Sequence, residues 1–192
     1  MGAAACSRRE GQGSVITLAP TAPDYAEPTV GWRVWDVVET GGTLRLSSLL
    51  YYTVWLPGQE TVACCRRPLA AFPWGRMPLH GPPNYDCYCG IHAVEKEAHA
   101  VAYLDAPVFK AAKGACRVLG RVSLWGRVVE CRWGWRAARA YPEHLFVPTP
   151  ARWRLSFARA ALHPSIPDIA PALAEYGVPV EIVARAEFRL SR

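Results

Sequence analysis

Apolar and polar residues alternate along 117–124, in the second half of the chain. Alternation over such a length predicts a strand with one buried face. After Gly126 the apolar phase reverses and continues to Trp135, which indicates either a hairpin or a bulge at the glycine. A third strand is predicted through Tyr141, and Pro142 should end it. With a hairpin at the glycine, the residues expected to face one core are Val118, Val122, Leu124, Val129, Cys131 and Trp133.

Extended segments are also predicted in the first half of the chain. Residues 30–38 are mostly β-branched and aromatic, as strands prefer. The sequence Thr-Gly-Gly-Thr at 40–43 predicts a turn, and residues 44–50 and 51–56 are expected to be extended after it. A short strand is predicted at 61–65.

Two helices and a final strand complete the predicted elements. Residues 94–104 carry apolar residues on one side and polar ones on the other, which predicts a helix. Asp168 is expected to cap a short helix that runs to Tyr176, since Gly177 is a common helix terminator. Alternation over 180–190 predicts a strand. Its apolar face should consist of Val180, Ile182, Ala184, Ala186, Phe188 and Leu190.

Together these elements predict an α+β fold, either mostly antiparallel β-sheet or a small SH3-like barrel, with one or two helices. Residues 1–28 show little periodicity and are predicted to form a mobile N-terminal tail. Residues 29–192 are predicted to form a single domain. Within it, residues 66–86 contain five prolines and two glycines, which exclude a helix or a central strand and predict a long loop.

The composition allows a packed core, because 51% of the 192 residues are apolar and 20% are charged. No run approaches the roughly 20 uncharged apolar residues of a membrane-spanning helix, so no membrane partner is expected. The first ten residues lack the basic start and apolar run of a secretory signal. The seven cysteines are therefore expected to be reduced in the cytoplasm, as free thiols, metal ligands or a reactive thiol.

Positive charge is concentrated in one part of the chain. Nine arginines and two acids give residues 117–159 a charge of +7, whereas the rest of the chain carries −1. Aromatic residues are interleaved with these arginines, as in proteins that bind single-stranded nucleic acid. A nucleic-acid-binding module is therefore one alternative function, and it requires several arginines on one exposed face with an exposed tryptophan. The arginines proposed for this role are Arg121, Arg127, Arg132, Arg136 and Arg139.

The most distinctive local sequence is CYCG, which contains Cys87 and Cys89. In an extended chain, residues two apart point to the same side, so these two cysteines could offer thiolates to one metal ion. Cys65 and His80 precede them and complete a set of three thiolates and one imidazole, which is a tetrahedral zinc set. Cys64 should face the opposite side of a strand from Cys65. The sequence therefore predicts a small structural zinc site.

Two other hypotheses stay open for the same residues. Free cysteines often serve as small buried apolar residues with no ligand. A cysteine-dependent enzyme would instead use Cys87 or Cys89 as the nucleophile and His80 or His92 as the base. The spacing is too short to specify this chemistry, and the chain has no serine elbow, P-loop, dinucleotide glycine motif or HExxH helix. His92 is also the spare candidate for a metal ligand.

Four short motifs carry a resemblance to other proteins. The sequences CYCGIHA, LWGRVVE, GWRA and AYP stand at 87–93, 124–130, 134–137 and 140–142. They resemble the signatures of a family of uncharacterised proteins from high-GC actinobacteria, and the resemblance spans most of 30–180. It implies that the cluster of cysteines and histidine matters to the family, and it implies no particular chemistry. His92 stands where the resemblance leads us to expect an aromatic residue, which argues against His92 as a ligand.

The function predicted from the sequence is that of a non-enzymatic binding or scaffolding protein with a small structural zinc site. A nucleic-acid-binding module built on residues 117–159 is the first alternative, and a cysteine-dependent enzyme is the second. The expected partner is an unidentified protein, and nucleic acid is the other possible partner.

Overall fold

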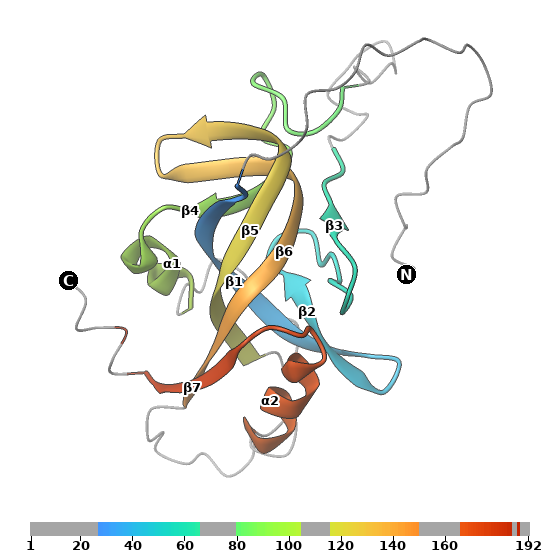
Figure 1. The fold of residues 1–192 in the computed structure, drawn as a ribbon, viewed down its shortest axis with the longest axis vertical. Helices are drawn as coiled ribbons and strands as arrows, with labels where there is room; N and C mark the ends of the chain where they lie inside the picture. The colour runs from blue at the N-terminus through green and yellow to red at the C-terminus, as the bar shows by residue number, and fades with distance from the viewer. Residues whose placement is uncertain (1–26, 66–79, 105–115, 150–165, 186–187, 189–192) are drawn as a thin grey trace.

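The computed structural model describes residues 27–65, 80–104, 116–149, 166–185 and 188. In these ranges it has a seven-stranded mixed sheet and two helices, so the predicted β-rich α+β class is confirmed (Figure 1). The elements are β1 (Thr29–Thr40), β2 (Thr43–Ser48), β3 (Thr61–Val62), β4 (Ile91–Val94), α1 (Glu97–Leu104), β5 (Cys116–Cys131), β6 (Gly134–Thr149), α2 (Ile166–Ala174) and β7 (Val180–Ala184). Neither helix is long and apolar enough to cross a membrane. Most of the predicted tail at 1–28 and most of the proline-rich loop at 66–86 lie outside the described residues.

Two glycines make the first hairpin. Gly41 and Gly42 have φ angles of 60° and 77°, which suit the two-residue turns that match the twist of paired strands. Six residue pairs then join β1 to β2. The segment predicted to be extended at 51–56 forms no strand: Val54 makes a single bridge to Ser47, with hydrogen bonds from Ser48 N to Thr53 O and from Trp55 N to Leu46 O on either side. The chain turns back on itself after β2 instead of continuing as a strand.

The strands β5 and β6, of 16 residues each, form the longest pair in the sheet. Their turn lies at Arg132 and Trp133, so the hairpin alternative at Gly126 is wrong. Gly126 instead marks a bulge, since its φ is 72° and the register shifts between Trp125 and Val128. A left-handed glycine is the hallmark of one bulge type, and the extra residue explains the reversal of the apolar phase.

The third strand predicted through Tyr141 does not exist as a separate element. Tyr141 and Pro142 both lie inside β6, which continues to Thr149. Pro142 follows a second register shift, between Arg121 and Val122 of β5. Bulges are among the few places where a sheet accepts proline, so Pro142 is accommodated without ending the strand.

The strand pairings close on themselves. β1 pairs with β5, β5 with β6, β6 with β4, and β4 with β1 through the single pair Trp32 and Val94. Glycine permits this approach: a Cβ on Gly31 would lie 2.8 Å from Ala93 Cβ, and one on Gly134 would overlap the Ala93 backbone. In Figure 1, β5 and β6 run through the middle of the view and α2 lies below them. The loop with the candidate ligands leads directly into β4.

The strand β4 is absent from the sequence-based prediction, and it shortens the predicted helix at 94–104. Val94 ends β4 and pairs with Gly134 of β6, so α1 begins only at Glu97. Ala100 and Leu104 form the buried side of α1. β4 has only four residues and α1 only eight. Neither is long enough to show a clear periodic pattern, so the sequence does not indicate where the strand ends and the helix begins.

The C-terminal elements differ from the prediction in two respects. α2 begins at Ile166, so Asp168 lies inside the helix and not at its cap, although Gly177 follows the last turn with a φ of 68° as expected. β7 pairs parallel with β6. Ile182 was expected on the core face but is 55% exposed, because Val183 packs inward in this edge strand.

The interior of the sheet is filled by one large apolar cluster. The expected core residues Val118, Val122, Leu124 and Val129 are buried, and Trp35 and Trp55 join them with ring centroids 5.4 Å apart. Trp133 was expected in this core, but it is 55% exposed. It lies at the β5–β6 turn, where its ring contacts His99 and the guanidinium of Arg132. The prediction failed because the turn is there and not at the glycine of the bulge.

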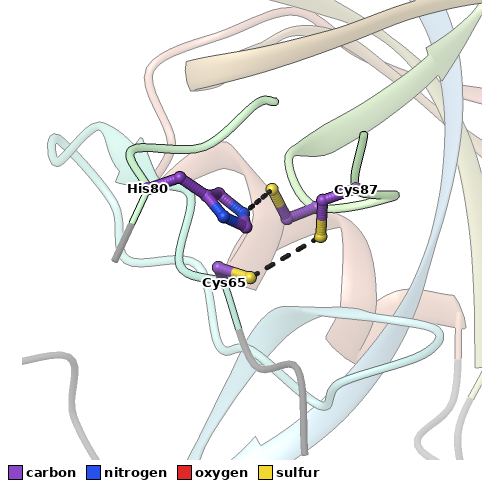
Figure 2. A group of neighbouring side chains, drawn as sticks. Cys65, His80 and Cys87 are labelled. Atoms are coloured by element: carbon purple, nitrogen blue, oxygen red, sulfur yellow. Dashed lines mark hydrogen bonds between the residues drawn. The ribbon is translucent and has the colours of Figure 1, made fainter. Parts of the chain in front are cut away.

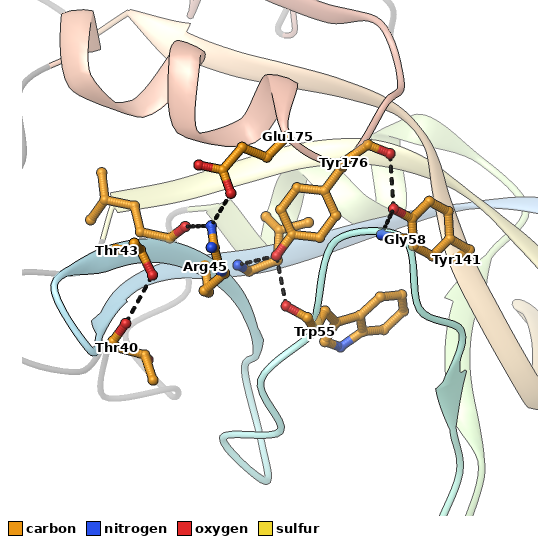
Figure 3. A network of polar contacts seen from close by, with 10 residues as sticks. Thr40, Thr43, Arg45, Trp55, Gly58, Tyr141, Glu175 and Tyr176 are labelled. Atoms are coloured by element: carbon orange, nitrogen blue, oxygen red, sulfur yellow. Dashed lines mark hydrogen bonds and ion pairs between the residues drawn. The ribbon is translucent and has the colours of Figure 1, made fainter.

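Two tyrosines tie the chain after β2 to the end of α2 (Figure 3). The Tyr176 hydroxyl accepts a hydrogen bond from Leu46 N at 2.9 Å and donates one to Trp55 O at 2.7 Å. The Tyr141 hydroxyl donates to Tyr176 O at 2.8 Å and accepts from Gly58 N at 2.7 Å. The buried backbone groups beside α2 are thereby satisfied.

Candidate metal centre

Three thiols and one imidazole meet beside the closed sheet. Cys65 follows β3, and His80, Cys87 and Cys89 lie in the loop that leads into β4, here named the ligand loop (80–90). Their ligand atoms all lie within 4.8 Å of one another, and Figure 2 shows the side chains turned toward one another. The structure thus brings together all four residues proposed from the sequence.

Two ligand-to-ligand distances in the cluster are close to the edges of a coordination tetrahedron. Cys65 Sγ lies 3.7 Å from Cys87 Sγ, and Cys89 Sγ lies 3.3 Å from His80 Nε2. Zinc bonds of about 2.3 Å to sulfur and about 2.0 Å to nitrogen give sulfur–sulfur edges of about 3.8 Å and sulfur–nitrogen edges of about 3.5 Å. A disulfide would need sulfur atoms about 2.05 Å apart, and none of the three cysteines is in a disulfide.

A tight turn sets the course of the ligand loop before its two cysteines. Asn84 Oδ1 accepts a hydrogen bond from Asp86 N at 2.9 Å, and Asn84 O accepts one from Cys87 N at 3.2 Å. Asparagine commonly stabilises turns in this way. Gly90 follows with a φ of 121°, and a Cβ there would lie 3.2 Å from Arg136 Cβ. Glycine therefore lets the loop enter β4 in close contact with β6.

Arg136 of β6 holds the backbone of the ligand loop. Its Nη1 donates to the carbonyl oxygens of Asn84 and Cys89 at 3.2 Å each, and also to that of Cys87. Its Nε donates to Cys131 Sγ at 3.2 Å. The residue is only 7% exposed, so it does not lie on the open face that the nucleic-acid hypothesis requires.

Sequence analysis missed the part that Asn84 and Arg136 play at this cluster. Arg136 pairs with His92 of β4, and that pairing places it behind the ligand loop. Because β4 was not predicted, the register could not be inferred. The one local signal was Asn84 itself, since asparagine three residues before a cysteine is compatible with a turn.

The electrostatics of the cluster argue against a nucleophile at Cys89. Burial raises the pKa of the Cys89 thiol to about 11; a backbone hydrogen bond from Asn84 lowers this pKa, and the thiols of Cys87 and Cys65 raise it. A catalytic cysteine needs the opposite shift, because the thiolate is the nucleophile. A bound cation reverses the balance and deprotonates the thiols that coordinate it.

The remaining candidates lie outside the cluster. Cys64 is exposed and is not among the four clustered ligands, although β3 ends at Val62 and the predicted strand does not reach the two cysteines. His92 Nε2 lies 2.9 Å from the carbonyl oxygen of Tyr88, and His92 is not among the four clustered ligands. Cys116 begins β5, where burial and the neighbouring Asp36 raise the pKa of its thiol.

The five arginines of the nucleic-acid hypothesis do not form one open basic surface. Arg121 Nε lies 3.5 Å from Glu143, and Arg139 Nη1 lies 3.0 Å from Glu60. The third arginine, Arg136, is buried at the ligand loop. The two others, both exposed, are Arg127 and Arg132. Only Arg132 lies over an exposed tryptophan ring, at 4.8 Å from its centroid.

Comparisons with protein-family models, with curated proteins and with solved structures found no match to this chain. The resemblance to the actinobacterial family therefore stays a prediction. What the site can do chemically is inferred only from the residue types and the geometry of the cluster. Three thiolates and one imidazole fill all four positions of a tetrahedral ion, whereas catalytic zinc sites keep one position open. The arrangement is suited to joining the chain after β3 to the ligand loop.

Proposed function

We propose that this chain is a non-enzymatic binding or scaffolding protein with a structural zinc ion held by Cys65, His80, Cys87 and Cys89. The observation that carries the proposal is the convergence of the four ligand atoms within 4.8 Å. Soft thiolates combined with imidazole suit zinc among the common divalent ions. A saturated set has no position for a substrate or a reactive water, which favours a structural role.

The proposal includes a cytoplasmic location and a protein partner. Thiolate ligands must stay reduced, and the cytoplasm keeps thiols in that state. On the ligand loop, Tyr85 and Tyr88 are 81% and 92% exposed. Tyrosine is enriched at protein interfaces, where its large ring becomes buried. In this proposal zinc fixes the loop that presents the two rings to a protein partner.

Elemental analysis and cobalt substitution test the zinc site. Purified wild-type protein should contain one zinc per chain, and Co²⁺ should produce the visible absorption of a tetrahedral thiolate complex. Cys65→Ser should abolish stoichiometric binding, whereas Cys64→Ser should retain it because Cys64 is exposed beside the cluster. Protein that binds no metal after reconstitution under reducing conditions, or equal losses in both variants, would contradict the proposal.

The nucleic-acid alternative has a separate test. Purified protein should show an ultraviolet absorbance ratio typical of protein alone, because two of the five arginines are paired with acids and one is buried. Co-purifying nucleic acid whose binding weakens steeply with added salt would favour the alternative.

A further inference from the structure

Arg136 is a buried cation without a carboxylate partner. It is 7% exposed, and none of the ion pairs among the described residues includes it. A buried charge is costly unless it is paired and hydrogen-bonded. Its hydrogen-bond acceptors are three carbonyl oxygens of the ligand loop and the thiol of Cys131. The guanidinium is therefore directed at the candidate metal centre.

The proposed zinc centre supplies the missing opposite charge. Coordination requires deprotonated cysteines and a neutral histidine, so a divalent ion with this ligand set carries one net negative charge. Arg136 bonds the carbonyl oxygens of Cys87 and Cys89, which places its positive charge at the backbone of two of the three thiolate ligands. The guanidinium and the metal centre together form a neutral unit.

We propose that Arg136 is the positioning residue of this centre, an inference that rests on the zinc site proposed above. Its Nη1 holds Cys87 and Cys89 through their carbonyl groups while its Nε bonds Cys131, and its charge balances the negative metal–thiolate unit. Loss of such an outer partner typically weakens metal affinity by about 10–100-fold. Lysine keeps the positive charge but lacks the planar guanidinium, which reaches Cys131 with one nitrogen and the ligand loop with another.

Three variants of the full chain separate these contributions. Zinc affinity is measured by competition with a chromophoric chelator, and ligand geometry by the absorption spectrum of the Co²⁺ form. Arg136→Met should bind zinc about 10–100-fold more weakly, and Arg136→Lys should show a smaller loss because the charge remains. Both variants should shift the cobalt spectrum. Arg139→Met is the matched control, since Arg139 lies on the same strand with its side chain 43% exposed, and it should match the wild type.

Two results would overturn the inference while leaving the zinc site intact. The first is wild-type zinc affinity with an unchanged cobalt spectrum in Arg136→Met. The second is an equal loss of affinity in Arg136→Met and Arg139→Met. If Arg136→Met does not fold, Arg136→Lys provides the test. A wild-type zinc affinity and cobalt spectrum in Arg136→Lys would refute a role for the planar guanidinium. A wild-type chain that binds no metal would overturn the zinc proposal and this inference with it.

Discussion

The interior of the sheet and the ligand loop are held in place by different forces. In the interior, Trp35, Trp55 and Leu124 are at most 1% exposed, and burial of apolar area stabilises them in proportion to that area. At the candidate metal centre all four candidate ligands are only partly buried, and Tyr88 on the ligand loop is 92% exposed. The loop therefore depends on directional bonds from a turn, from a buried arginine and from the proposed ion. A short loop beside a sheet cannot bury enough apolar area to be fixed by packing alone.

The largest expected effect comes from breaking the interior. Trp35→Ala should lower the free energy of unfolding by about 3–5 kcal/mol, because the ring is fully buried and packs edge-on against Trp55. Denaturant titration measures this loss, and the folded fraction should keep its zinc. A loss below about 1 kcal/mol would mean that the interior is not the main source of stability.

Removal of the proposed metal should destabilise the ligand loop and leave the packing of the interior unchanged. Zinc at about a thousandfold excess over its Kd stabilises a fold by about 4 kcal/mol, and each 1 kcal/mol corresponds to about 2–4 °C in Tm at this chain length. A chelator should therefore lower the Tm by about 8–16 °C. Cys65→Ser is the control and should melt at one temperature with or without chelator. An unchanged wild-type Tm in the presence of the chelator would contradict the proposal that a bound ion stabilises the fold.

The tyrosine network should have a smaller effect than either and shares a property with each region, because its bonds are polar but buried. Tyr176→Phe leaves Leu46 N and Trp55 O without the hydroxyl that bonds both. The expected loss in the free energy of unfolding is about 1–3 kcal/mol. Tyr141→Phe should cost less, since its hydroxyl bonds an exposed turn at Gly58. Equal stability of wild type and Tyr176→Phe would show that water replaces the hydroxyl.

The same hydroxyl predicts a pH dependence. Burial raises the pKa of Tyr176 from 10.0 to about 12, against a lowering effect of the Leu46 backbone. The unfolded chain releases this proton first, so the wild type should lose stability as the pH rises from about 10 to about 12. Tyr176→Phe lacks the proton and should show a shallower slope in denaturant titrations over this range. Parallel slopes would contradict the raised pKa.

Trp133→Ala should have the smallest effect. This tryptophan is 55% exposed and contacts Arg132 and His99 at the β5–β6 turn. Exposed cation–π contacts contribute about 0.5–1 kcal/mol, so the loss in unfolding free energy should not exceed about 1 kcal/mol. A loss of about 3–5 kcal/mol would instead support the sequence-based expectation that Trp133 is a core residue.

Sequence patterns located the elements whose signals are local. The Gly41-Gly42 turn and the alternation at 117–124 depend on neighbours in the chain, and both are present in the structure. Gly126 was ambiguous because a hairpin and a bulge both reverse the apolar phase. β4 was missed because a strand of four residues is defined by its partners β1 and β6, and these lie far away in the sequence.

The candidate site also combines features that local sequence reveals with features that depend on distant strand pairing. Its ligands could be chosen from the sequence because thiols and imidazoles are recognisable by residue type, and the loop between Cys65 and Cys87 could bring them together. Arg136 was assigned to an exposed basic surface, since its sequence neighbours are basic and aromatic. Its burial depends on the pairing with His92 across β4 and β6, which no local pattern contains.

The closed ring has a consequence for how the chain folds during synthesis. β1 forms its hairpin with β2 at once, but Trp35 pairs with Val118 on its other side, 83 residues later in the chain. At about 5–20 residues per second, the ribosome needs about 4–17 s to supply that partner. During this interval one side of β1 is an unpaired strand edge, which readily pairs with other chains. The nascent hairpin is therefore the stage at which we expect aggregation to compete with folding.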